Sequence, residues 1–437
     1  MTLICIDGHN LSLPHGSGIA TYSRSLLAAV EATGARKGIV HGPPAAVPAQ
    51  PLLREVMVND ARIRVRALTL GRPNRRVQAA LAPFGKRARP VSPSGKVLWP
   101  DHGATPDADV FWLSTDLFRI ANRAFSDYRI LTPLDLRPSE FGRPDLMHWT
   151  YPAPVHARGV PNIYTVHDLI PLRLPHTTLD DKKRFLDLCH AVARRADHIV
   201  TVSETTRRDM ISLLGVEEDR ITSTWQPTHL PPGALDRSEA EVAASVEDVF
   251  GLGWKEYFVF FGAIEPKKNV GRLVEAYLRS GVKTPLVVVG GRGWLEEHET
   301  GLLDEVLANG GSPAASRLRR YEFLPRPLLI DLLRGARATL FPSLYEGFGL
   351  PVLESMMLGT PVLASNAGSL PEIAGSATLQ VDPYDVDAMA GAIRTLNADD
   401  DLRADLTARG QERAGHFTPE VFEGRMADLY RRLGVTG

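Results

Sequence analysis

Short apolar segments typical of β-strands alternate with helix-like segments along almost the whole chain. Alternation of this kind favours parallel sheets whose faces are covered by helices, and such sheets bind ligands at the carboxyl ends of their strands. The sequence therefore predicts an α/β protein with its site at those strand ends. The strand-like segments are residues 3–7, 109–114, 145–151, 162–168, 198–203, 257–264, 285–291, 319–324, 338–344, 361–366 and 377–382.

A stretch with several prolines and glycines divides this pattern into two series. Residues 226–255 begin with QPTHLPPGAL and regain helical periodicity only locally, which is typical of an interdomain connection. The length of 437 residues allows two or three domains at roughly 150 residues each. We expect two Rossmann-like domains, a connection and a last helix that packs back on the first domain, with the boundaries 1–230, 231–255, 256–416 and 417–437.

The composition excludes several classes of function. Fifty Lys and Arg against 51 Asp and Glu give a formal charge of −1, which removes the simplest argument for a nucleic-acid-binding protein. The cysteines, Cys5 and Cys189, are too few for a disulfide scaffold or an all-cysteine metal site. No signal-peptide pattern or membrane-spanning apolar stretch is present. We expect a cytoplasmic protein, and attachment to the inner face of the cytoplasmic membrane stays open.

Residues 61–100 carry ten cations and no acidic residue. One interpretation is a solvated surface segment. The other is contact with anionic lipid headgroups or with a lipid-diphosphate acceptor, since clustered cations near a membrane contribute roughly 1 kcal/mol each and the apolar residues between them can insert. No nucleic-acid-reading module accompanies the cations. They are Arg62, Arg64, Arg66, Arg72, Arg75, Arg76, Lys86, Arg87, Arg89 and Lys96.

The stretch FPSLYEGFGLPVLE places a glycine-containing turn between a strand and a helix. Pro351 suits the first turn of that helix, whose free N–H groups and positive dipole end can receive a diphosphate. Glu346 precedes the helix and Glu354 lies within it, so two carboxylates can accept hydrogen bonds from a polyhydroxylated ligand. The structural alternatives are an exposed loop acid at Glu346 and a helix-dipole partner at Glu354.

The stretch FFGAIEPKKN places Lys267 and Lys268 directly after another strand. Two lysines at a strand end can neutralise phosphate oxygens without a metal, although taken alone they are typical of a solvated surface. Together with Glu346 and Glu354, they predict a site for a nucleotide-diphosphate sugar.

The motifs GAIEPKKN, EGFGLPVLE and GTPVLASNAGSLPE resemble those of the retaining family-4 glycosyltransferases, whose GT-B fold has two Rossmann-like domains that face a cleft. The segments PHGSGIATYSRSLL and YTVHDLIPL resemble the first-domain, acceptor side of that cleft. The resemblance implies metal-independent hexosyl transfer with retention of configuration, and no cofactor besides the sugar-nucleotide donor. The pairs Asp107/Asp109 and Asp385/Asp387 match a metal signature only in spelling, and we expect surface acids there.

The resemblance also assigns roles to residues of the second half. Lys268 resembles the lysine that contacts donor phosphate, Glu346 the acid that touches donor-sugar hydroxyls, and Glu354 the acid that holds the ribose. Gly262 is followed by Ala263 rather than by the arginine of many members, so Lys267 is expected to supply the second charge. Further donor contacts, several of them through backbone groups, are expected from Gly347, Phe348, Gly349 and Leu350. The loop of Glu322, Phe323 and Leu324 is expected to receive the nucleobase.

In the first half, His167 is expected to contact the donor sugar, although a lone histidine is usually structural. Asp168 is expected to orient His167 or to cap its loop. Gly16 and Gly18 either approach the diphosphate or sugar closely or are ordinary turn glycines. Thr21 stands where the last glycine of a dinucleotide fingerprint belongs, which disfavours a nicotinamide-dependent oxidoreductase.

For the substrate, EPKKN most resembles bacterial mannosyltransferases of surface-polysaccharide assembly, such as those of lipopolysaccharide O-antigen. We therefore expect GDP-mannose or a GDP-linked deoxyhexose as the donor, and a lipid-linked or growing glycan as the acceptor. A UDP-sugar-dependent glycosyltransferase is the nearest alternative. A non-catalytic glycan-binding or assembly protein with the GT-B fold is the alternative from another class.

Overall fold

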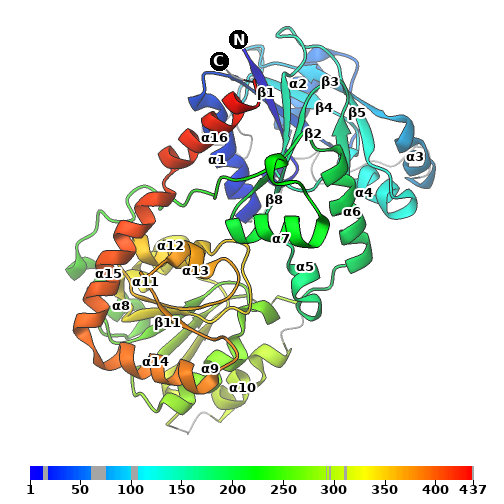
Figure 1. The fold of residues 1–437 in the computed structure, drawn as a ribbon. Helices are drawn as coiled ribbons and strands as arrows, with labels where there is room; N and C mark the ends of the chain where they lie inside the picture. The colour runs from blue at the N-terminus through cyan, green and yellow to red at the C-terminus, as the bar shows by residue number, and fades with distance from the viewer. Residues whose placement is uncertain are drawn as a thin grey trace.

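The computed structural model describes residues 1–12, 18–60, 75–99, 107–291, 293–294, 297–309 and 313–435. Two lobes, each built on a sheet flanked by helices, lie one above the other in Figure 1. We call them the N-terminal lobe, which holds strands β1–β10, and the C-terminal lobe, which holds β11–β16. Mixed helices and mainly parallel sheets agree with the predicted fold class.

The N-terminal lobe contains a ten-stranded sheet in the order β10-β9-β8-β6-β1-β2-β4-β3-β5-β7. The strands from β10 to β4 are parallel to one another, whereas β3 runs antiparallel to β4, and β5 and β7 follow the direction of β3. The strands are β1 (Leu3–Asp7), β2 (Arg36–His41), β3 (Lys86–Val91), β4 (Val110–Leu113), β5 (Thr132–Leu136), β6 (Leu146–Trp149), β7 (Val155–Ala157), β8 (Asn162–Val166), β9 (His198–Thr201) and β10 (Ile221–Ser223).

The C-terminal lobe contains a parallel six-stranded sheet in the order β13-β12-β11-β14-β15-β16. This is the doubly wound order of a Rossmann-like domain, which reverses direction between its first and fourth strands and binds ligands at that point. The strands are β11 (Phe258–Phe261), β12 (Leu286–Val289), β13 (Leu318–Tyr321), β14 (Ala338–Phe341), β15 (Val362–Ser365) and β16 (Leu379–Val381).

Helices cover the faces of both sheets with their apolar sides inward. In α9, for example, Val270, Leu273, Val274 and Tyr277 are buried at helical spacing, as predicted. The helices are α1 (Gly18–Ala32), α2 (Pro51–Asn59), α3 (Arg75–Leu81), α4 (Leu117–Tyr128), α5 (Ile170–Arg173), α6 (Lys182–Arg195), α7 (Glu204–Leu214), α8 (Glu239–Phe250), α9 (Val270–Ser280), α10 (Glu297–Ala308), α11 (Arg326–Gly335), α12 (Leu350–Met357), α13 (Leu370–Ala374), α14 (Val386–Ala398), α15 (Asp400–Ala414) and α16 (Pro419–Arg432).

The chain passes between the lobes at two places. The predicted connection contains α8, which a capping box at Ser238 begins and whose Phe250 packs against Tyr321 of the C-terminal lobe at 5.5 Å between ring centroids. At the end of the chain, α16 rises from the C-terminal lobe and lies along α1 (Figure 1). There Phe422 packs against Tyr22 at 5.8 Å.

Every predicted strand segment contains a strand, but the sequence pattern missed β2, β3, β5, β7 and β10. The interpretation of residues 61–100 as only a solvated surface segment is wrong for β3, because Ala88 and Val91 are buried against the two faces of the sheet. Residues 61–74 and 100 lie outside the described residues. Both cysteines are buried. No helix of the described part is long and apolar enough to span a bilayer.

Candidate functional site

The loops that follow β11 and β14 meet where the strand order of the C-terminal sheet reverses. The β11 loop ends in a short 3-10 turn, Pro266–Lys268, and the β14 loop leads through Glu346 to α12. The N–H of Leu344 donates to the carbonyl oxygen of Lys267 at 2.7 Å, which ties the two loops together. The two motifs singled out in the sequence therefore form one site.

Lys268 and Glu346 form a mostly buried ion pair in this site. The distance from Lys268 Nζ to Glu346 Oε1 is 2.6 Å, and the side chains are 12% and 11% exposed. Burial raises the pKa of Glu346, but Lys268 and Lys267 more than offset this effect and hold the pKa below its usual value. Glu346 is therefore a carboxylate at neutral pH, ready to accept hydrogen bonds from hydroxyl groups.

Glu265 is a second buried acid beside the lysines, and the sequence reading assigned it no role. Its Oε1 lies 3.5 Å from Lys267 Nζ, and its buried Oε2 has no hydrogen-bond partner among the described residues. Burial raises the pKa of Glu265. Burial lowers the pKa of Lys267, but Glu346, Glu265 and Asp168 outweigh it, so this pKa is raised. Lys267 therefore keeps its charge close to where donor phosphate is predicted.

The start of α12 lies at the same point. Gly349 precedes the helix with φ +118°, a value that favours glycine, and Pro351 stands in the first turn as predicted. Glu354, one turn further, accepts hydrogen bonds from both terminal nitrogens of Arg326 at 3.2 and 2.9 Å. The sequence reading missed Arg326, which lies 28 residues away at the start of α11. A ribose bound by Glu354 would share the carboxylate with this guanidinium.

His167 and Asp168 follow β8 at the carboxyl edge of the N-terminal sheet. The Nε2 atom of His167 lies 2.9 Å from the carbonyl oxygen of Thr150, and since a carbonyl only accepts, Nε2 carries the proton. Burial lowers the pKa of His167, so the ring is neutral and its Nδ1 is an acceptor. Asp168 Oδ1 accepts from the N–H of Ile170 at 3.0 Å. This contact agrees with the alternative in which Asp168 caps its loop.

The two lobes touch through these loops. A Cβ atom added at Gly347 would lie 2.6 Å from the carbonyl oxygen of His167 and 2.8 Å from Asp168 Cβ, so the loop that carries Glu346 lies directly against the loop that carries His167. A Cβ atom added at Gly18, the first residue of α1, would lie 3.7 Å from Leu350, the first residue of α12. The structure thus brings the predicted residues of both lobes together.

The other predicted residues differ in their placement. Phe348 is buried and packs edge-on against Phe417 at 5.7 Å, and its carbonyl oxygen accepts from Ser369 Oγ at 2.6 Å, so it supports the loop through its side chain. Phe323 is 80% exposed, and Leu324 is half-buried. Gly16 lies outside the described residues.

The aspartate pairs have structural partners. Asp107 is ion-paired with Lys37 at 2.9 Å, and Asp109 accepts from the N–H of Lys37 at 2.7 Å. Asp385 caps α14, and Asp387 contacts Arg279. Within the described ranges, no group of three or more His, Cys, Asp or Glu side chains is arranged to hold a metal ion.

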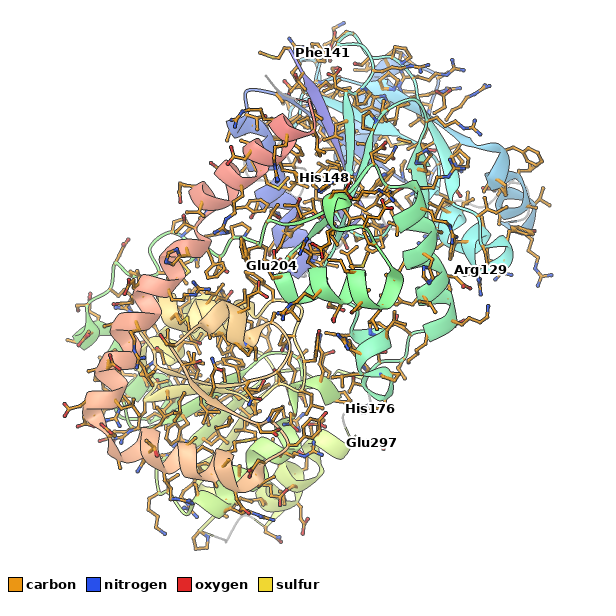
Figure 2. All side chains as sticks on the ribbon, viewed as in Figure 1. Arg129, Phe141, His148, His176, Glu204 and Glu297 are labelled. Atoms are coloured by element: carbon orange, nitrogen blue, oxygen red, sulfur yellow. The ribbon has the colours of Figure 1, made fainter. Side chains whose placement is uncertain are left out.

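Polar contacts between the lobes surround the site, and sequence reasoning missed all of them. The carboxylate of Glu372, on α13, accepts from the N–H groups of Glu204 and Thr205 at 2.7 and 2.9 Å. It also accepts from Thr205 Oγ1 at 3.1 Å and from Trp225 Nε1 at 2.6 Å. Figure 2 shows Glu204 at the end of α7 that faces the C-terminal lobe. The first turn of α7 is therefore capped by an acid of the other lobe.

A second contact joins Tyr345, the residue before Glu346, to α7. The hydroxyl of Tyr345 donates to Asp209, which is buried and also accepts from Arg173. No short-range pattern marks these partners, because Tyr345 and Asp209 are 136 residues apart.

Two family models match the chain. The model described as "Glycosyl transferases group 1" matches residues 248–413, and "Glycosyltransferase Family 4" matches residues 63–224. O-antigen chain mannosyltransferase B of Escherichia coli is 33% identical over 276 residues, which are 62% of this chain and 70% of that protein. The serotype-specific mannosyltransferase WbdA of Escherichia coli is 29% identical over 279 residues, but the match spans only 33% of WbdA.

Solved structures show the same architecture. Sucrose-phosphate synthase from Thermosynechococcus elongatus superposes with a TM-score of 0.66 at 18% identity over 99% of both chains. WaaG, a glycosyltransferase involved in lipopolysaccharide biosynthesis, superposes with a TM-score of 0.59 at 14% identity over 98% of this chain and 99% of WaaG. At these identities the likeness concerns the fold alone, and it confirms the predicted GT-B fold.

Proposed function

Since this chain belongs to the glycosyltransferase families of group 1 and family 4, we propose that it transfers mannose, or a GDP-linked deoxy relative, to a lipid-linked or growing surface-polysaccharide acceptor. The identity to O-antigen chain mannosyltransferase B supports the sugar and the acceptor class. The observation that carries the proposal is the buried Lys268–Glu346 pair beside the start of α12. It offers charges of both signs at the point where such a sheet binds a nucleotide.

In the proposed reaction, the bond between the anomeric carbon and the diphosphate oxygen breaks. Negative charge grows on the leaving phosphate, where Lys267, Lys268 and the free N–H groups of α12 stabilise it more than in the ground state. The acceptor oxygen bonds to the anomeric carbon on the face that the phosphate leaves, and its proton passes to a phosphate oxygen. This route gives retention without a carboxylate nucleophile and, in our proposal, without a metal or other cofactor.

Glu346 and His167 hold the sugar in this proposal. When Lys268 turns towards the phosphate, the ionised carboxylate of Glu346 accepts from sugar hydroxyls. The Nδ1 atom of neutral His167 accepts from another hydroxyl, because its Nε2–H is bonded to Thr150. Both contacts restrain the sugar near the leaving phosphate, which lowers the entropic part of the barrier.

Thermal unfolding with separate nucleotides tests the donor. We expect GDP and GDP-mannose to raise the midpoint of unfolding and UDP to leave it unchanged, because a ligand that binds only the native state stabilises it by mass action. Stabilisation by UDP but not by GDP would establish the UDP-sugar alternative. Analysis of the anomeric configuration of the product tests retention.

Turnover by variants tests the catalytic assignment. We expect Lys268→Ala and Glu346→Gln to lose about 10²-fold or more in kcat, as groups that stabilise developing charge or position a substrate do. Lys283→Ala is the matched control, since Lys283 is an exposed lysine of the same lobe. Unchanged turnover in folded variants would remove both assignments. Glycan binding without turnover of any donor would support the non-catalytic alternative.

We also propose peripheral association with an anionic membrane through residues 61–100. Among the described residues there, Leu81 and Phe84 are 56% and 79% exposed beside the cations. Binding to vesicles of phosphatidylglycerol should weaken when Arg76, Arg87 and Arg89 are changed to Gln, and when salt is added. If the parent protein does not bind such vesicles, the proposed membrane association fails and the exposed cations of this segment are solvated surface.

A further inference from the structure

A cavity of about 560 Å³ opens in the N-terminal lobe, away from the Lys268–Glu346 pair. It lies beside β3 and β5, the strands that follow β4 in the order of the sheet. Its lining includes three cations, Lys86, Arg87 and Arg158, together with Ser114 and the apolar side chains of Leu81 and Phe84. None of these residues has a role in the proposed chemistry of transfer.

The three cations around this cavity have no carboxylate partner within ion-pair distance in the described part of the chain. Asp135 is the one acid in the described lining, and it faces Arg137 at 3.6 Å and Arg143 at 3.9 Å. Burial lowers the pKa of Lys86 to about 8, against the opposing effect of Asp116. The three cations therefore line the cavity without an ion-paired carboxylate in the described part of the chain.

A buried hydroxyl group completes the lining. Ser114 is 2% exposed, and its Oγ has no hydrogen-bond partner among the described residues. Leaving such a group unsatisfied costs about 1–3 kcal/mol, and the hydroxyl could donate a hydrogen bond to a bound anion. The hydroxyl and the cations together are suited to phosphate oxygens.

The position of the cavity relates it to the transfer site. Ser114 follows β4 and His167 follows β8, and the parallel strands β8, β6, β1, β2 and β4 are consecutive in the sheet. Their carboxyl ends share one edge, and four strand spacings place Ser114 about 19 Å from His167. A ligand that reaches both places must be extended, as a glycan chain is.

We propose that this cavity binds a phosphate or diphosphate group of the acceptor, while the glycan part of the acceptor runs along the sheet edge to His167 and Glu346. The inference rests on the proposed function and adds a chemical feature to its acceptor. Leu81 and Phe84 at the rim are placed to contact an apolar chain attached to the phosphate. A lipid-linked diphosphate and a free phosphorylated glycan share the group that the cavity recognises.

Titration calorimetry in the presence of saturating GDP-mannose or GDP tests the cavity with two probes, inorganic diphosphate and farnesyl diphosphate. We expect both to bind and to compete with each other. Arg87→Gln and Arg158→Gln should each weaken binding about 10-fold. Arg89→Gln is the matched control, because Arg89 is an exposed residue of the same strand and carries the same charge, but lies outside the cavity lining.

The outcomes separate the sources of the phosphate. Tighter binding of farnesyl diphosphate, with loss of the gain in Phe84→Ser, supports a lipid-linked acceptor. Equal affinities support recognition of phosphate alone. If neither probe binds the parent protein, or if Arg87→Gln and Arg89→Gln weaken binding equally, the cavity is not a phosphate site and diffuse surface charge accounts for any attraction.

The same variants distinguish this inference from the proposed function. Arg87 lies outside the donor loops, so stabilisation by GDP should be unchanged in Arg87→Gln, whereas the KM for a phosphate-bearing acceptor should rise about 10-fold with kcat retained. If no sugar nucleotide binds the parent protein, the proposed function fails. Diphosphate binding that depends on Arg87 would still establish the cavity as an anion site.

Discussion

Changing Glu372 to Gln removes one oxygen from the carboxylate that joins the lobes. Each oxygen accepts two hydrogen bonds: Oε1 from the N–H of Glu204 and from Trp225, and Oε2 from the N–H and the hydroxyl of Thr205. In Gln, an NH₂ group replaces one of these oxygens. This group is a donor, so it cannot accept the two hydrogen bonds that the oxygen accepted. The hydroxyl of Thr205 can rotate away, but a backbone or indole N–H cannot.

The expected cost follows from this geometry. A buried donor left without an acceptor costs about 1–3 kcal/mol, and loss of negative charge beside the start of α7 costs about 0.3–1 kcal/mol. Because Glu372 is only half-buried, water can replace part of the lost bonding. We therefore expect the free energy of unfolding to fall by about 2 kcal/mol.

Urea titration followed by tryptophan fluorescence measures this change, since Trp225 lies at the contact. Glu239→Gln is the control, because Glu239 is an exposed carboxylate in the first turn of α8 and reports the effect of charge at a helix start alone. We also expect kcat to fall in Glu372→Gln, while GDP affinity is retained, because α13 directly follows Ser369, which holds the carbonyl oxygens of Glu346 and Phe348.

A loss in Glu372→Gln no larger than that in Glu239→Gln would refute the view that this carboxylate joins the lobes. An unchanged kcat with the expected loss of stability would refute its effect on the position of Glu346. Glu372→Ala gives a second check, since it leaves all the N–H donors without an acceptor and should be more destabilising than Glu372→Gln.

Three further predictions concern other parts of the molecule. Gly347→Ala should lower kcat/KM by about tenfold or more in a transfer assay, because its Cβ would meet the carbonyl oxygen of His167 at 2.6 Å and a small displacement of reacting groups is costly; Gly424→Ala, which meets nothing within 4 Å, is the control. Burial raises the pKa of Asp7 to about 6 from 3.8, although Thr150 and His9 donate to it, so its contribution to stability is full below about pH 3.8 and is lost as the pH rises through 6. Asp7→Asn should flatten that decline by up to about 3 kcal/mol in urea titrations from pH 4 to 7. Tyr430→Phe should cost about 1–3 kcal/mol and make α16 more sensitive to protease, because it breaks the buried hydrogen bond of 2.8 Å to His148.

The sequence predicted the local structure around Glu346 well because each element there is short-range. Strand, glycine turn and helix start follow one another within FPSLYEGFGLPVLE, and the structure places Gly349 and Pro351 as that pattern requires. The ion pair between Lys268 and Glu346 joins residues 78 positions apart, yet both follow strands, and the strand order brings their ends together. Parallel topology was enough to predict that meeting.

Other features had no local pattern to reveal them. The buried residues of strand β3, Ala88 and Val91, do not alternate along the strand, so they give too weak a signal beside its charged residues. Arg326 binds Glu354 across 28 residues, and Glu372 meets Thr205 across 167. These contacts depend on how whole helices pack, which spacing along one segment does not encode.

The contacts of α7 show how the two halves of the site are held in register. In its first turn, Thr205 contacts Glu372 of the C-terminal lobe, while the hydroxyl of the next residue, Thr206, donates to the carbonyl oxygen of His167 at 3.1 Å. One turn of the helix later, Asp209 accepts from Tyr345, the neighbour of Glu346. One helix therefore contacts both the loop of His167 and the loop of Glu346, through residues of the same face. A sugar bound between those two residues would be positioned by α7, although α7 itself carries none of the groups that were predicted to touch it.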